Sequence, residues 1–285
     1  MDIIFLESSS HYSIPVDNLL EGQSRSSTKR IGSGPEVWHD LFPLANGDRQ
    51  SPINIITRDA IYDPSLQPLQ VNYDHDSAKV VINTGHTFTM EFDDGDDTSV
   101  LRGGPFIGSY RLRQFHFHWG SSDGHGSEHK VDGMDYAAEL HIVHWNSEKF
   151  SSFVEAACAP DGLAVLGVFL KVGEPNRYIE RITDTFGAIR SKGKQSPFTN
   201  FDPSCLLPAS MDFWTYPGSL TVPPLLESVT WVVLKEPISI SHEQLARFRS
   251  LLFTKDTAEI EACCMKSNHR PVQPLKNRKV RASFL

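Results

Sequence analysis

The sequence QFHFHW, residues 114–119, alternates polar or ionisable side chains with aromatic ones. Such a period of two is typical of a β-strand, whose successive side chains point to opposite faces of a sheet. The three aromatic side chains therefore share one face, and Gln114, His116 and His118 share the other. Because the aromatic face favours burial, we expect this stretch to be an interior strand that carries two imidazoles.

Similar stretches recur along the chain and are rich in the β-branched and aromatic residues that favour strands. These predicted strands lie within residues 79–92, 109–119, 137–145, 164–172 and 228–240. Clusters of Gly, Asp and Ser separate them, as antiparallel connections require. Apolar spacing of three and four predicts a helix in residues 176–193. A serine cap at Ser241 with Glu243 in the first turn predicts a second helix in residues 241–253. We therefore expect a mostly β (α+β) protein with peripheral helices around a large, twisted, mainly antiparallel central sheet.

The first 33 residues differ in composition from the rest of the chain. Residues 21–34 are rich in Ser, Gly and basic residues and have no apolar periodicity, so we expect residues 1–33 to form an atypical, flexible N-terminal tail. No repeat and no second linker interrupts the remainder. Residues 34–285 are therefore expected to fold as a single domain, a length that large β domains reach.

The charge balance argues against a polyanionic partner. The chain has 35 acidic and 27 basic residues, for a net charge of −8, so no global attraction to nucleic acid or to an anionic membrane is expected. No apolar run approaches the roughly 20 residues of a membrane span. The four cysteines form no CxxC pair and are expected to be free thiols. These features predict a cytoplasmic protein that binds neither nucleic acid nor a membrane.

A second predicted strand, AELHIVHW at residues 138–145, places Glu139 and His141 on one face. If this strand pairs with the first, a third imidazole joins the other two. Three neutral imidazoles are a usual ligand set for a catalytic zinc ion, which keeps a fourth position open. Gln114 and Glu139 each precede a histidine by two residues and could fix its ring orientation. The alternative is a set of hydrogen-bonded core histidines, an interpretation that we keep for most other histidines.

Six longer motifs stand in a fixed order along residues 34–284. They are QSPINI from residue 50, FHFHWG from 115, GSEHKVDG from 126, YAAELHIVHWN from 136, PDGLAVLGVFLKVG from 160 and FWTYPGSLTVPPLLESVTW from 213. In these motifs the chain resembles the alpha-class carbonic anhydrases, and their common order argues against a chance match. Among the members of that family, the chain is most similar to the vertebrate cytosolic isozymes, with isozyme XIII as the nearest.

The resemblance implies a zinc enzyme, a lyase that reversibly converts carbon dioxide to bicarbonate and a proton and so serves pH regulation. It implies His116, His118 and His141 as the zinc ligands. Gln114 and Glu139 would support them from behind. The alternative is a catalytically weak binding module of the same family, and the intact histidine set argues against it.

The same resemblance implies roles for residues around the zinc ion. Zinc-bound hydroxide would attack carbon dioxide, Thr221 and Glu128 would orient the hydroxide, and His86 would carry the proton away. The residues that would bind the substrate form a wall of mainly apolar character and comprise Val143, Val165, Leu220, Thr221, Val222 and Trp231. Sulfonamide-type inhibitors are expected to bind such a site, and the protein is expected to be a monomer.

One departure from the family lies near the N-terminus. Members usually carry a Trp-Gly-Tyr-Gly-like segment directly before GPE, where this chain has STKRIGS. Both aromatic residues are absent, so we expect somewhat lower stability and a perturbed proton path, with the metal ligands unaffected. An altered first exon or a wrongly assigned start would explain this segment equally well.

Overall fold

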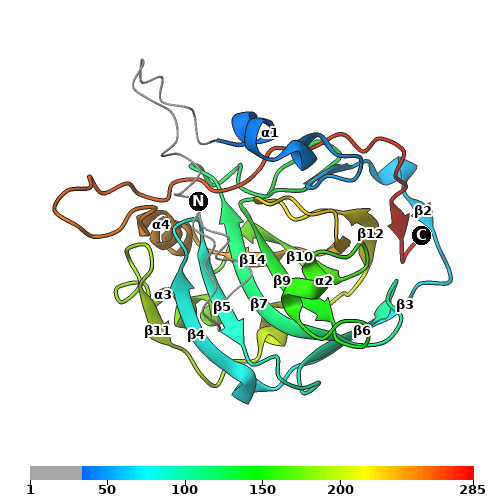
Figure 1. Ribbon diagram of the computed structural model, residues 1–285, viewed down its shortest axis with the longest axis horizontal. Coiled ribbons are helices and arrows are strands. Elements are labelled where there is room, and N and C mark those ends of the chain that lie inside the picture. Colours follow the sequence, from blue (N-terminus) through cyan, green and yellow to red (C-terminus); the bar gives the residue numbers. More distant parts are fainter. Residues whose placement is uncertain (1–33) are drawn as a thin grey trace.

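Within residues 34–285, which the computed structural model describes, thirteen strands form one twisted, mixed sheet (Figure 1). They are β2 Ile61–Tyr62, β3 Gln67–Asn72, β4 Ala78–Asn83, β5 Phe88–Phe92, β6 Val100–Gly104, β7 Tyr110–Trp119, β9 Ala138–Asn146, β10 Leu163–Val172, β11 Gln195–Pro197, β12 Phe213–Gly218, β13 Val229–Leu234, β14 Ile238–Ile240 and β15 Arg281–Ala282. A separate parallel pair consists of β1 Asn54–Ile55 and β8 Lys130–Val131. The α-helices are α1 Trp38–Leu41, α2 Phe153–Ala157, α3 Arg177–Thr183 and α4 His242–Ser250. Short 3-10 helices are η2 Pro35–Val37, η3 Pro43–Asn46, η4 Thr57–Asp59, η5 His75–Ser77 and η6 Pro203–Leu206.

The long path through the sheet runs in the order β11-β4-β5-β7-β9-β10-β13-β12-β15-β2. Its pairs are antiparallel except β10–β13 and β15–β2, and β14 also lies parallel to β10. The prediction of a mostly β protein with a large, mainly antiparallel central sheet is confirmed. The predicted N-terminal tail, with the segment that replaces the family's aromatic residues, lies outside the described residues.

The register between β7 and β9 brings the two histidine-bearing strands together. His116 lies directly opposite His141 in this antiparallel pair, so the predicted pairing is confirmed. A β-bulge between Leu112 and Gln114 shifts the side-chain alternation of β7 by one residue. Leu112 and Phe115 are three residues apart, yet both are fully buried in the same core cluster because the bulge lies between them.

The aromatic face of β7 anchors the strand in the main core. Phe115, Phe117 and Trp119 are fully buried. The ring centroid of Phe88 in β5 lies 5.3 Å from that of Phe117, and the ring centroid of Phe248 in α4 lies 5.2 Å from that of Trp119. Burying each side chain of this size stabilises the fold by about 2–3 kcal/mol. This packing determines which face of β7 is turned away from the core, and the two histidines lie on that face.

The first predicted helix is shorter than expected, because α3 ends at Thr183 instead of continuing to residue 193. Beyond that point the N–H groups of Phe186 and Ile189 each donate to the carbonyl three residues earlier, which is the spacing of tight turns. Gly187 lies between them and is a poor helix former. The side chains of Phe186 and Ile189 are nevertheless buried. The apolar face predicted for this segment is therefore built from one short helix and the turns that follow it.

The second predicted helix begins where expected and ends early. Ser241 and Gln244 form a capping box at the start of α4. The helix ends at Ser250, because Leu251 adopts an extended conformation with ψ of 156°. Leu251 and Leu252 follow the helix in an extended segment, and their side chains are buried. The prediction that this helix extends to residue 253 was therefore wrong.

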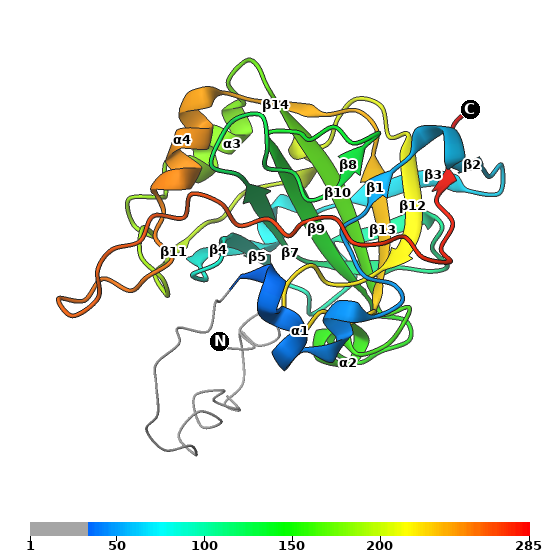
Figure 2. The same ribbon diagram turned by 90° about the horizontal axis from the view of Figure 1, so that it is seen from above.

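The helices lie at the margin of the sheet, as predicted. In both ribbon views α3 and α4 lie side by side at one end of it (Figure 1 and Figure 2). None of the helices in the described part of the chain has the length and apolar character needed to cross a membrane.

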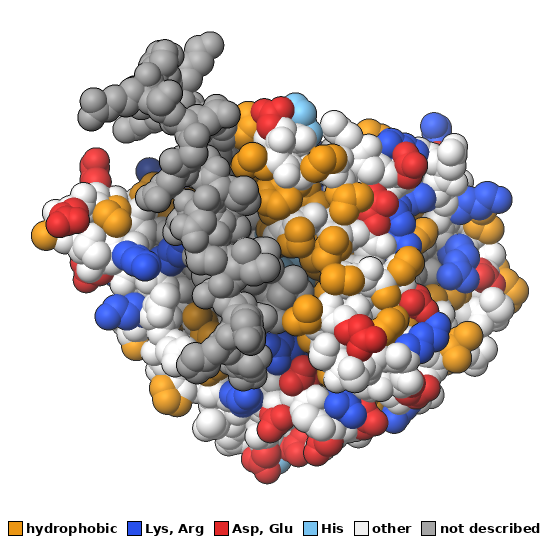
Figure 3. Space-filling model, viewed as in Figure 1, with side chains coloured by type: hydrophobic (Ala, Val, Ile, Leu, Met, Phe, Trp, Pro, Cys, Tyr) orange, Lys and Arg blue, Asp and Glu red, His pale blue; other side chains and the backbone are white. Residues whose placement is uncertain are grey.

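One face of the molecule carries a concentration of apolar side chains. Figure 3 shows them in the middle of this face, with acidic and basic side chains mixed around them. Leu41 in α1 and Val154 in α2 are among the exposed hydrophobic side chains of the described residues. Acidic side chains gather at the lower edge of this face, with basic side chains close by (Figure 3).

His144 is a buried titratable group in the core, on the face of β9 opposite the predicted ligand. Its Nδ1 lies 3.1 Å from the carbonyl oxygen of Ala164, and its Nε2 lies 2.7 Å from the hydroxyl of Tyr73. A carbonyl oxygen only accepts, so Nδ1 carries the proton and Nε2 accepts from Tyr73. Burial lowers the pKa of His144 to about 4. The folded protein therefore holds this ring neutral.

We expect His144 to make the folded protein less stable in mild acid. In the unfolded chain the pKa of this histidine returns to about 6.5. Between about pH 6.5 and pH 4 the unfolded state therefore binds more protons, and the free energy of unfolding falls as the pH falls. For this one group the loss from pH 7 to pH 5 is about 2 kcal/mol. Urea unfolding at both pH values measures it.

The variant His144→Gln should be less stable than the wild type at pH 7 and should lose about 2 kcal/mol less on acidification, because it has no imidazole to protonate. Equal pH dependence in the His144→Gln variant and the wild type would contradict the prediction.

Candidate metal centre and active site

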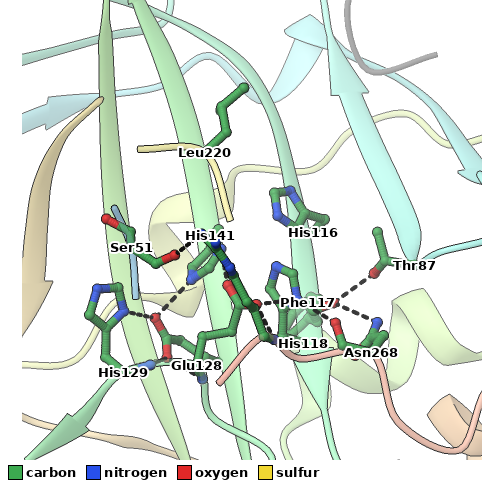
Figure 4. A network of polar contacts seen from close by, with 12 residues as sticks. Ser51, Thr87, His116, Phe117, His118, Glu128, His129, His141, Leu220 and Asn268 are labelled. Carbon is green, nitrogen blue, oxygen red and sulfur yellow. Dashed lines mark hydrogen bonds and ion pairs between the residues drawn. The ribbon is translucent and has the colours of Figure 1, made fainter. Parts of the chain in front are cut away.

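Three histidine side chains meet where β7 and β9 pair. His116 and His118 come from β7 and His141 comes from β9. The ring centroid of His118 lies 5.0 Å from that of His116 and 4.7 Å from that of His141. One ligand nitrogen of each ring lies within 4.8 Å of the others, and Figure 4 shows the three rings close together. The structure therefore assembles the predicted set of metal ligands.

Each of the three imidazoles donates from one ring nitrogen to an oxygen that can only accept. The pairs are His116 Nδ1 to Gln114 Oε1 at 2.8 Å, His118 Nδ1 to the carbonyl oxygen of Asn268 at 2.9 Å, and His141 Nε2 to Glu139 Oε1 at 2.8 Å. The other nitrogen of each neutral ring keeps its lone pair. Gln114 and Glu139 thus lie where the sequence placed them, each fixing the tautomer of a candidate ligand.

Burial lowers the pKa of all three imidazoles. It lowers the pKa of His118 to about 4 and that of His116 well below the usual value, and the neighbouring imidazoles add to the effect at His116. Burial also lowers the pKa of His141, although Glu139 opposes this shift. The rings are therefore neutral near pH 7, which is the form that binds a metal cation.

The state of His118 Nε2 indicates whether a metal ion fits between the three imidazoles. Nε2 is buried and has no hydrogen-bond partner among the described residues, an uncommon and costly state for a polar atom. A cation bound to this lone pair would remove that cost. Three neutral imidazoles, grouped without a fourth ligand among residues 34–285, suit a catalytic zinc ion, so the residues could hold zinc.

Glu139 is a buried carboxylate that joins the histidine cluster to the neighbouring loop. Its Oε2 accepts from the backbone N–H groups of Glu128 and His129, both at 2.8 Å. Its Oε1 accepts from His129 Nδ1 at 2.7 Å as well as from His141. Burial by itself raises the pKa of Glu139, but the two imidazoles and the hydrogen bonds outweigh burial and hold the pKa well below its usual range. The ionised carboxylate thus fixes both His141 and the loop.

Glu128 lies buried beside the histidine cluster. Its Oε1 accepts from the backbone N–H of Arg270 at 2.8 Å and lies 3.3 Å from His118 Nδ1. Burial raises the pKa of this carboxyl, and nearby groups that include His141 and the Thr221 hydroxyl offset only part of that rise. Oε2 has no partner with hydrogen-bond geometry among the described residues. This oxygen is therefore available as an acceptor for the Thr221 hydroxyl.

Two cavities adjoin the histidines. The larger has a volume of about 630 Å³, and His86, His116, His118, Glu128 and Thr221 are among the residues that line it. The smaller has a volume of about 50 Å³ and reaches His116 and His141. All six residues of the predicted substrate wall line the smaller cavity: Val143, Val165, Leu220, Thr221, Val222 and Trp231. The structure thus places an apolar cavity and the predicted proton carrier on the same histidine cluster.

The sequence reasoning did not single out Asn268 or Arg270, which support the site from behind. Both come from an irregular segment near the C-terminus, where no periodic pattern could have indicated them. His129 was interpreted as a hydrogen-bonded core histidine, and it is fully buried, with its Nε2 2.6 Å from the Tyr216 hydroxyl. Its position in the motif GSEHKVDG, directly after Glu128, was the signal that it belongs to the network of the site.

Comparison with known proteins agrees with this geometry. A family model described as eukaryotic-type carbonic anhydrase matches residues 33–284. Carbonic anhydrase 1 of Monodelphis domestica is 57% identical over 252 residues, which cover 88% of this chain and 95% of that relative. This relative does not single out isozyme XIII, which stays a prediction. The matched length and the level of identity establish that the chain belongs to the eukaryotic-type carbonic anhydrase family of enzymes.

Proposed function

We propose that this protein is a zinc-dependent enzyme that reversibly hydrates carbon dioxide to bicarbonate and a proton. The observation that carries the proposal is the cluster of His116, His118 and His141, in which three neutral imidazoles are oriented by acceptors and adjoin an apolar cavity. In carbonic anhydrases, zinc held by three histidines makes a coordinated water acidic enough to supply a nucleophile near neutral pH. The residues of this chain would bind carbon dioxide, orient the attacking oxygen and carry the released proton away from that centre.

Thr221 and Glu128 would orient the attacking oxygen. When ionised, Glu128 accepts the proton of the Thr221 hydroxyl, and its Oε2 has no competing partner among the described residues. The Thr221 oxygen can then only accept a hydrogen bond from the attacking oxygen, whose lone pair is thereby aimed at carbon. The Thr221 backbone N–H can meet negative charge that develops on the substrate oxygen.

The small apolar cavity suits carbon dioxide, which has no charge and no net dipole. Val143 and Trp231 are almost fully buried in its wall, so they offer contact without a hydrogen bond that the substrate would have to satisfy. A charged product gains little from such a wall and is better solvated in the larger cavity, where Lys192 and His86 are found. Carbon dioxide would be held against the apolar wall, and bicarbonate would leave through the larger cavity.

His86 would carry the proton from the centre to the solvent. It lies in the turn between β4 and β5, is partly exposed and lines the larger cavity together with His116 and His118. An imidazole exchanges protons near neutral pH, and water in a cavity of this size can connect it to the centre. We also propose that the protein is a cytoplasmic monomer of the isozyme XIII type that binds sulfonamide-type inhibitors.

The first prediction from the proposed function concerns the activity itself. The purified protein should contain one zinc ion per chain and should hydrate carbon dioxide in stopped-flow assays, with inhibition by a simple aromatic sulfonamide. The weak binding module of the same family is the alternative outcome, and it would appear as stoichiometric zinc without sulfonamide-sensitive hydration. That result would refute the enzymatic proposal.

The second prediction concerns zinc affinity. His141→Ala should abolish stoichiometric zinc binding because one of three ligands is lost. Glu139→Gln keeps the ligand but loses the negative charge that supports it, and should weaken zinc binding about 10–100-fold, as measured by competition with a chelator. The variant Glu155→Gln changes an exposed carboxyl of α2 that is not one of the proposed zinc-site residues, and it should bind zinc like the wild type. Full affinity in the Glu139→Gln variant would contradict this support.

The third prediction concerns the proton carrier. His86→Ala should lower the turnover number about tenfold or more in dilute buffer, because a general acid–base group is lost. Added imidazole should restore turnover by accepting the proton from solution. His269→Ala removes a histidine from the same cavity and should retain turnover. Unchanged turnover in the His86→Ala variant would place the proton route elsewhere.

A further inference from the structure

We propose that Asn268 is a positioning residue that holds the turn carrying His86 at a fixed distance from the strand carrying His118. The inference rests on the proposed function, in which His86 exports a proton. Its evidence is a set of hydrogen bonds that Asn268 makes in two directions. Its backbone carbonyl accepts from the candidate ligand His118, and its carboxamide donates to the backbone of the candidate proton carrier His86.

The backbone of Asn268 continues the hydrogen bonding at the end of β7. Its N–H donates to the carbonyl oxygen of Trp119 at 3.1 Å, and its carbonyl oxygen accepts from His118 Nδ1 at 2.9 Å. Its side-chain Oδ1 accepts from the N–H of Trp119 at 2.7 Å. Asn268 is therefore fixed to β7 on both sides of the ligand, and Figure 4 shows its side chain beside Phe117 and His118.

The other end of the carboxamide reaches the turn. Nδ2 donates to the carbonyl oxygen of His86 at 2.9 Å and to that of Phe117 at 3.3 Å. Thr87, the next residue of the turn, donates from its hydroxyl to the same Phe117 carbonyl at 2.6 Å. One amide group thus bridges the turn and the middle of the histidine-bearing strand.

The turn has its own internal hydrogen bonds, which do not fix its distance from β7. The Thr84 hydroxyl donates to the carbonyl oxygen of Thr87 at 3.0 Å, and Asn83 Oδ1 accepts from the N–H of Gly85 at 2.8 Å. Gly85 has φ of 81°, which a side chain would oppose. These contacts set the shape of the turn. The position of the turn relative to β7 is instead set by the bond from the Thr87 hydroxyl to Phe117 and by the Asn268 bridge, and the Asn268 bridge is the bond that holds the His86 carbonyl itself.

That position matters because a proton crosses between the centre and His86 through water. A displacement of about 1 Å in a reacting group can cost about 100-fold in rate, and a loosened turn samples such displacements. Proton export follows the conversion of carbon dioxide. Loss of the Asn268 bridge should therefore lower kcat in dilute buffer and leave kcat/KM unchanged.

The chemistry requires an amide at this position. An asparagine side chain accepts at Oδ1 and donates at Nδ2, so it serves Trp119 and His86 at once. Aspartate keeps the acceptor and loses the donor, while alanine loses both. Neither substitution removes the backbone carbonyl that accepts from His118, so the zinc ligand keeps its support in both variants.

The test compares Asn268→Asp and Asn268→Ala with the wild type. Both variants should lower kcat in dilute buffer about three- to tenfold, the usual effect of one lost hydrogen bond, with kcat/KM and zinc stoichiometry unchanged and with rescue by added imidazole. In the zinc-free protein, amide hydrogen exchange at Thr87 and neighbouring turn residues should accelerate by a similar factor. Ser267→Ala, next to Asn268, is the matched control and should change neither quantity.

A double-mutant cycle with His86→Ala decides whether the effect passes through that histidine. If it does, Asn268→Ala causes no further loss of kcat in the His86→Ala background, whereas an additive loss would overturn the proposal. Loss of zinc in the Asn268→Asp variant, or unchanged amide exchange in the turn, would also overturn it. If His86→Ala alone leaves turnover unchanged, the proposed proton route fails, and the exchange measurement still decides whether Asn268 holds the turn. Should Asn268→Ala not fold, Asn268→Asp carries every comparison.

Discussion

The register of β7 against β9 is the constraint on which the metal site depends. His116 and His141 face each other only because the two strands pair in this register. A shift by one residue would turn every side chain of a strand to the opposite face and would bring the aromatic residues of β7 into the site. The buried aromatic face of β7 therefore protects the geometry of the site, since any such shift would expose Phe115 and Phe117.

A single buried carboxylate extends this constraint beyond the two strands. Glu139 belongs to β9, yet it accepts from the backbone of the loop that carries Glu128 and His129. Four donors around one carboxylate offset the cost of burying its charge. The orientation of His141 and the position of Glu128 consequently depend on the same group, so the candidate ligand and the candidate orienting carboxyl are built as one unit.

Sequence reasoning was most effective where the chain is periodic. The alternation in residues 114–119 predicted both the strand and the face that carries His116 and His118, and the spacing to Gln114 predicted a contact that the structure contains. It failed at the ends of α3 and α4, where the apolar pattern continues after the backbone has left the helical conformation. An apolar face records which residues are buried, and short helices followed by turns can bury the same residues as one long helix.

The remaining supports of the site could not be predicted because they come from segments without a period. Asn268 lies 150 positions from His118, and an isolated asparagine in an irregular segment has the same local appearance as a surface loop residue. The ligands need lone pairs at the correct spacing, which a strand supplies by its own geometry. Their orientation needs acceptors that approach from outside the strand, and only tertiary structure can deliver them. The ligand histidines can therefore be predicted from the alternation of a strand. The acceptors that come from other segments to orient them have no such pattern in the sequence.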